Sequence, residues 1–139
     1  MGLLEFLLEK RNPGKIGDIK KNNQPIKYVS LTILIIKLIV SLSIVFGLFY
    51  ITVLNNLNFI NTVTFILILL IYCFISYKFI PQPDATNVGL LGGLIDHPFR
   101  ISDDFNRMLI VLLVLLYPGR FISTTIMQII VFIREERRK

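Results

Sequence analysis

Two cations lie inside long apolar stretches of this sequence, and they are the residues most able to support chemistry. Lys37 lies within the apolar stretch 28–53 and Arg120 within the apolar stretch 108–133, and neither stretch contains an acidic residue. An ionisable side chain deep in such a run is costly to leave unpaired. The missing counter-charges therefore predict an acidic partner subunit, a lipid phosphate or an anion outside the chain. Thr124 and Gln128 follow Arg120 at intervals of four residues, so on a helix they extend one polar stripe.

Both cations also have a structural interpretation. Lys37 lies nine residues after the start of its run, or ~13 Å along a helix, so its stem could carry the ammonium part of the way back to the lipid headgroups. Ser41, one turn later, shares that face and favours contact with protein over lipid. Arg120 lies at the middle of its run and directly follows Pro118 and Gly119. Its guanidinium could help to satisfy the carbonyl that the proline leaves without a donor.

A further candidate group, Asp96, His97 and Arg100, lies in a polar loop where acid–base or metal chemistry is conceivable. His97 is the only histidine of the chain, and the only cysteine, Cys73, is distant in the sequence, so these residues cannot build a zinc site. An Asp-His-Pro step is more typical of a turn that leads into a helix cap. We predict no metal, no cofactor and no catalytic residue. A membrane enzyme that uses this loop is the weakest of the functional hypotheses.

Three apolar runs must position these side chains. Residues 28–53, 58–80 and 104–133 are each long enough to cross the ~30 Å hydrocarbon core of a membrane as a helix, which satisfies its own backbone groups in lipid. We therefore predict an all-α integral membrane protein in which residues 1–139 form one small bundle of about three transmembrane helices. The third is expected either to be kinked at Pro118-Gly119 or to form a re-entrant hairpin of two short helices.

The sequence leaves the number of crossings open between two and three. Six cations precede the first run and four follow the last, which places both ends on the cytoplasmic side and favours an even number. The third run has the length of one full span, about 25 residues, and its polar stripe is continuous. Three crossings are preferred, because a buried hairpin turn needs more surrounding protein than this chain supplies. The N-terminus is predicted on the cytoplasmic side of a bacterial inner membrane, or on the matrix side of an organellar one.

Shorter segments flank the runs. Residues 1–12 are expected to form an interfacial amphipathic helix, and residues 134–139 a basic tail. Residues 81–107 are expected to form an interfacial loop, because their glycine-rich centre, 89–95, is too short to cross the membrane. Ser102 is the expected N-cap of the last helix.

Composition narrows the classes of partner. The chain has 139 residues, of which 54% are hydrophobic, and a formal net charge of +6. Because no recognition module fits beside the apolar runs, nucleic acid is not expected as a partner and membrane lipids are. Ser43 and Gly47 have small-xxx-small spacing, which would let another helix pack closely against the first run.

The leading hypothesis is a non-catalytic structural or accessory subunit of a larger membrane complex, in an energy-transducing or transport assembly. Three thin spans bury little surface between themselves, so their polar seam and two cations are expected to contact other membrane subunits. The alternative is a homo-oligomeric channel or pore-forming effector. In that hypothesis Lys37, Arg120, Thr124 and Gln128 line an anion-selective path.

Overall fold

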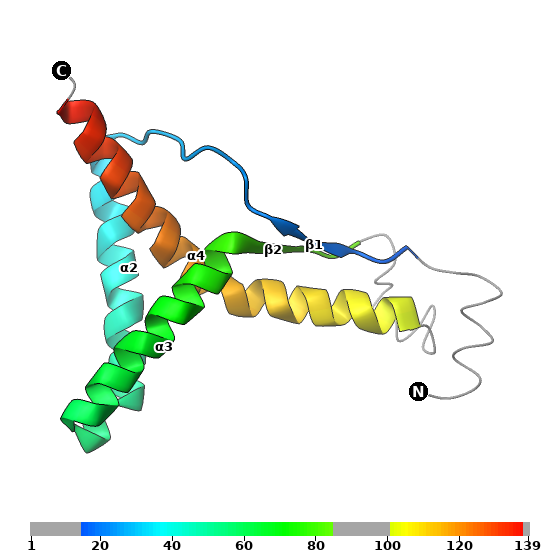
Figure 1. Cartoon of the computed structure of the whole chain (residues 1–139), viewed down its shortest axis with the longest axis horizontal. Coiled ribbons are helices and arrows are strands. Elements are labelled where there is room, and N and C mark those ends of the chain that lie inside the picture. The colour runs from blue at the N-terminus through cyan, green and yellow to red at the C-terminus, as the bar shows by residue number, and fades with distance from the viewer. Residues whose placement is uncertain (1–14, 85–100, 138–139) are drawn as a thin grey trace. The chain divides into compact units, whose positions relative to one another are not determined.

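The computed structural model describes residues 15–84 and 101–137. Its elements, in chain order, are β1 (Asp18–Lys21), α2 (Leu31–Thr52), a short 3-10 helix η1 (Leu54–Asn56), α3 (Phe59–Lys78), β2 (Phe79–Gln82) and α4 (Ile101–Glu136) (Figure 1). The interfacial helix predicted for residues 1–12 and the glycine-rich stretch 89–95 lie outside the described residues. Asp96, His97 and Arg100 also lie outside them.

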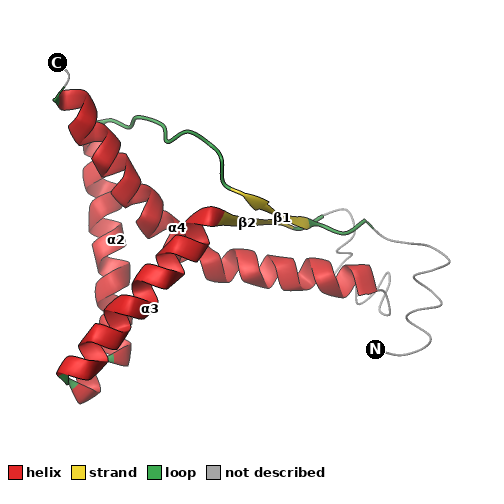
Figure 2. Ribbon diagram, viewed as in Figure 1, coloured by secondary structure: helices red, strands yellow, loops and turns green. Residues whose placement is uncertain are grey.

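The structure is mostly helical, and its three α-helices are long and apolar enough to cross a membrane (Figure 2). This confirms the prediction of a helical chain with three membrane-spanning candidates. Exposure of these helices is high, since only 11% of the most apolar window of α2 and 6% of that of α3 are buried, against 28% for α4. Apolar surface of this kind is stable in lipid or against another protein, and α4 is the helix that the rest of the chain covers most.

A small sheet corrects the prediction of an all-α fold. β1 and β2 pair in antiparallel register, from Asp18 opposite Gln82 to Lys21 opposite Phe79. These strands were not predicted from the sequence, because each has only four residues and neither alternates between polar and apolar side chains. Pro81 also argues against a central strand, but a two-stranded sheet has only edge strands, where proline is tolerated.

The last apolar run forms one helix and not a hairpin of two helices. α4 extends over 36 residues with Pro118 inside it, and at 1.5 Å per residue it measures about 54 Å. It begins at Ile101, one residue before the predicted cap, so Ser102 lies in the first turn of the helix and is not its N-cap. Of the residues predicted as the loop 81–107, those up to 82 belong to β2, those from 101 belong to α4, and residues 85–100 lie outside the described structure.

The chain divides into two compact units, and their boundary falls within α4. The sheet unit contains residues 1–21 and 79–115, and its described part holds β1, β2 and the first fifteen residues of α4. The helical unit contains residues 22–78 and 116–139, with α2, α3 and the remainder of α4.

Aromatic and backbone contacts hold the helical unit together at two places. Near the turn between α2 and α3, the rings of Phe49 and Phe65 meet edge to face with centroids 5.4 Å apart. At the opposite end of α3, the amide of Asn22 donates to the carbonyl of Lys78 at 2.9 Å. These contacts fit a helical hairpin in which the segment before α2 returns to the end of α3, as the short connection through η1 requires.

Candidate functional site

Small and polar side chains, not large apolar ones, fill much of the contact region of the helical unit. Its fully or nearly buried polar residues are Ser41, Ser76, Ser123 and Thr125. Small residues allow helix backbones to approach closely, and in lipid such packing replaces the hydrophobic effect as the source of helix association. The hydroxyls of Ser123 and Thr125 donate to carbonyls of their own helix at 2.8 Å, so their burial leaves no unsatisfied donor.

Lys37 and Gln128, two residues that the sequence singled out, are in direct contact. Lys37 lies on α2 and is half-buried, and its Nζ donates to Oε1 of Gln128 on α4 at 3.0 Å. The amide oxygen accepts one proton of the ammonium but carries no formal charge. The pair therefore fixes the ammonium in place between two helices, while the positive charge of Lys37 stays uncompensated within the described part of the helical unit.

Arg120 and Thr124 lie on the same stripe of α4 but have different environments. The hydroxyl of Thr124 donates to the carbonyls of Arg120 and Phe121, at 2.8 and 3.0 Å, so it is satisfied by its own helix. Arg120 is half-buried, and its guanidinium makes no hydrogen bond or ion pair with any described residue. An arginine in this position still has five donor groups to offer to a partner.

Gly119 is a point of close contact between α3 and α4. Its backbone amide donates to the hydroxyl of Tyr72 at 3.1 Å, so a side chain of α3 enters the hydrogen-bond ladder of α4 directly after Pro118. A Cβ atom at Gly119 would lie 2.5 Å from both Ser76 Oγ and Tyr72 Cε1. A larger residue at this position therefore requires the side chains of Ser76 and Tyr72 to move. Ser76 Oγ is fully buried and has no hydrogen-bond partner in the described structure, which makes the contact a tight packing site with one unsatisfied hydroxyl.

Asn106 organises the sheet unit. This side chain of α4 is fully buried, and its Oδ1 accepts from the amides of Gly17 at 2.8 Å and Asp84 at 3.3 Å. Its Nδ2 donates to the carbonyl of Lys15 at 2.9 Å. One amide thus ties the segment before β1 and the segment after β2 to the same turn of α4. Gly17 is required here because a Cβ would collide with the carbonyl oxygen of Gln82 and with backbone atoms of the next two residues.

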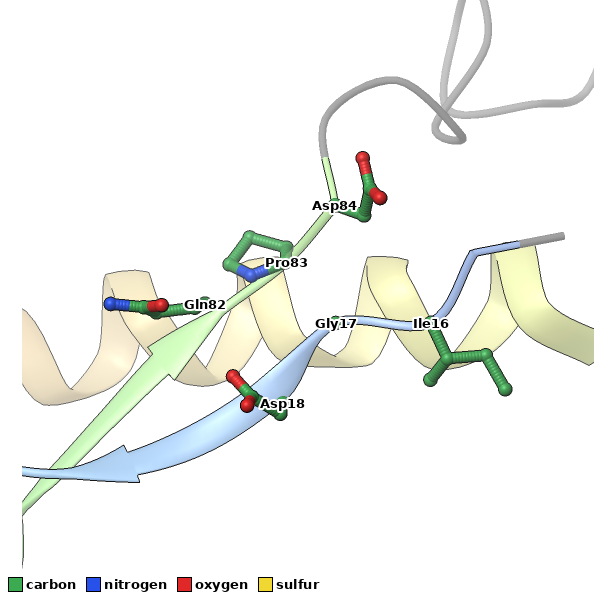
Figure 3. Close-up of a pocket in the computed structure, with 6 residues that line it drawn as sticks. All are labelled: Ile16, Gly17, Asp18, Gln82, Pro83 and Asp84. Atoms are coloured by element: carbon green, nitrogen blue, oxygen red, sulfur yellow. The ribbon is translucent and has the colours of Figure 1, made fainter.

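An open pocket of about 400 Å³ lies beside this junction, lined by Ile16, Gly17, Asp18, Gln82, Pro83 and Asp84 (Figure 3). The carboxylates of Asp18 and Asp84 do not converge on a common point in this view. No group of three histidine, cysteine or acidic side chains that could hold a metal occurs among the described residues. The pocket therefore presents no recognisable metal or catalytic arrangement. Also on α4, Arg107 Nη1 and Asp104 Oδ1 form an ion pair at 3.3 Å, in which Asp104 is exposed and Arg107 is half-buried.

Ser43 and Gly47, the pair predicted to pack against another helix, have open surroundings. A Cβ at Gly47 would meet no heavy atom within 4 Å, and the hydroxyl of Ser43 donates to the carbonyl of Ile39 in its own helix. Ser43 and Gly47 are thus available to another chain, and their role in helix packing stays a prediction. The contacts of Asn106 and Tyr72 and the packing role of Gly119 were not predicted from the sequence.

Comparisons of the chain with protein-family models, with curated proteins and with solved structures give no match.

Proposed function

We propose that this chain is a non-catalytic, multi-pass subunit of a larger membrane complex, and that Lys37 and Arg120 mark the surface where a partner subunit binds. The observation that carries the proposal is that neither cation has an acidic partner among the described residues. Lys37 is held by the neutral amide of Gln128, and the guanidinium of Arg120 has no partner among the residues described. Since charges in apolar segments are retained where they pair, an acidic or phosphate group of a partner is the expected complement.

The exposed surface of the helices supports the same proposal. α2 and α3 bury little of their apolar windows against this chain, and Gly47 leaves open space beside α2. A small-residue site on such a surface suits a helix from another subunit, because close backbone approach gives van der Waals contact that lipid tails do not match in shape. The chain alone therefore offers both an electrostatic and a packing surface for assembly.

Isolation of the tagged protein from its native membrane in mild detergent, followed by a measurement of native mass, tests this proposal. A hetero-oligomer is expected. Arg120→Leu should leave the chain inserted in the membrane but release partner subunits, whereas Lys78→Gln should not, because Lys78 is exposed at the end of α3 and lies over the ring of Phe74. A monomer would contradict the proposal. A homo-oligomer of defined mass that conducts anions would favour the channel hypothesis instead.

A further inference from the structure

We infer that the segment just before α2 and the end of α4 form a single basic face of the protein, and that this face binds the anionic phospholipids of one membrane surface. The basic face is defined by Lys27, Tyr28, Phe132, Arg134 and Arg137. All three of its cations are exposed. The inference does not depend on the proposed accessory role.

Two contacts bring the ends of α2 and α4 together. The rings of Tyr28 and Phe132 stack with centroids 5.8 Å apart and an interplanar angle of 16°. Further into the helices, Lys37 Nζ meets Gln128 Oε1 at 3.0 Å. Tyr28 lies three residues before the start of α2, so the path from the first contact to the second runs forward into α2 and backward along α4. The two helices are antiparallel where they touch (Figure 1).

This direction decides the side on which the chain ends. Three complete crossings in succession would make α2 and α4 parallel, with the start of α2 and the end of α4 on opposite faces of the membrane. The antiparallel contact places them on the same face. α2 and α3 then provide two crossings and α4 does not complete a third. This topology differs from the three crossings that the run lengths favour, but the charge bias of the sequence, with cations before the first run and after the last, agrees with the contact.

The charge of the basic face suits an anionic lipid surface. Lys27, Arg134 and Arg137 are opposed by Glu135 and Glu136, and the sequence adds two more cations at positions 138 and 139, so this end carries a net charge of +3. Cations beside a membrane-spanning helix attract the acidic lipids of the cytoplasmic leaflet. Tyr28 is 53% exposed beside these cations, and a tyrosine at this level places its ring among acyl chains and its hydroxyl among headgroups.

Cysteine labelling tests the topology that the inference requires. In a Cys73→Ser background, single cysteines are introduced as Asn23→Cys, Arg137→Cys and Asn56→Cys, all at exposed positions. In sealed vesicles, a membrane-impermeant maleimide should reach positions 23 and 137 from one side and position 56 from the other. Reaction of position 137 from the side of position 56 would overturn the inference.

Lipid retention in native mass spectrometry tests the partner. The purified full chain, given equal amounts of phosphatidylglycerol and phosphatidylcholine, should retain phosphatidylglycerol preferentially. Removal of two cations in Arg134→Gln/Arg137→Gln should weaken that retention by roughly 25-fold, or about fivefold for each charge. The control Lys20→Gln/Lys21→Gln removes two exposed cations from β1 and should have a smaller effect. Equal retention of the two lipids by the wild type, or equal losses in the two double variants, would refute this binding site.

Discussion

A single added methyl group at Gly119 should separate α3 from α4. In the structure, a Cβ at this position lies 2.5 Å from Ser76 Oγ and from Tyr72 Cε1, and 2.8 Å from Tyr72 Cζ. The ring of Tyr72 must therefore move in Gly119→Ala, and its hydroxyl then loses the amide of Gly119 that it accepts at 3.1 Å. The variant thus combines a steric conflict with the loss of one interhelical hydrogen bond.

The expected change in the free energy of unfolding is the sum of two destabilising terms and one stabilising term. Overpacking by one carbon costs about 1–3 kcal/mol, and a lost interhelical hydrogen bond in a membrane costs about 0.6 kcal/mol. Alanine in place of glycine in a helix interior recovers about 1 kcal/mol. Gly119→Ala should therefore lower the free energy of unfolding by about 0.6–2.6 kcal/mol.

Gly47→Ala is the matched control, since it makes the same change in α2 where no heavy atom lies within 4 Å. That variant should gain the helix-propensity term alone and become more stable by about 1 kcal/mol. Unfolding by sodium dodecyl sulfate in mixed micelles, followed by tyrosine circular dichroism, measures both. Equal shifts of the same sign in the two variants would show that α4 does not approach α3 at Gly119.

Two further predictions concern the polar contacts. Asn106→Ala removes three part-buried hydrogen bonds to backbone groups, each of which contributes about 0.5–1.5 kcal/mol to stability. Hydrogen exchange at the amides of Gly17 and Asp84 should then accelerate by at least about tenfold, whereas Asn61→Ala, which removes an exposed bond to the carbonyl of Asn56, should leave those amides unchanged. A double-mutant cycle of Lys37→Met and Gln128→Leu should give a coupling free energy of about 0.6–1.7 kcal/mol, and zero coupling would contradict the contact between these helices.

The apolar helices could be predicted from the sequence because their signal is local. A run of about 20 apolar residues has few alternatives to a membrane helix. Lys37 and Gln128 stand out in the sequence as polar residues within apolar runs. Their contact could not be predicted, because it joins positions 91 residues apart. It depends on the register of α2 against α4, which no periodicity within either helix encodes. The two strands were missed for the same reason, because the pairing of β1 with β2 is not visible in four residues of either.

Two glycines show that residue spacing alone does not predict which residues pack against another helix. Gly47 with Ser43 and Gly119 with Ser123 have the same four-residue spacing, yet only Gly119 contacts a neighbouring helix within this chain. Asn106 lies in a polar segment directly before an apolar stretch, and such a segment is typical of an exposed first turn of a helix. Its burial arises from segments 22 and 89 residues away. Identity and spacing can therefore propose such residues, but only tertiary contacts can select among them.

The most direct test of the accessory role is site-specific photo-crosslinking from the stripe of Arg120 in the native membrane. A photoreactive residue in place of Thr124, one turn after Arg120, should form an adduct with a different protein, and Arg120→Leu should abolish that adduct. The same probe at Ile126, which is 50% exposed and lies about 200° around the helix from position 124, should label lipid. Adducts from position 124 that contain only lipid, or only a second copy of this chain, would contradict the proposal that Arg120 faces a partner subunit.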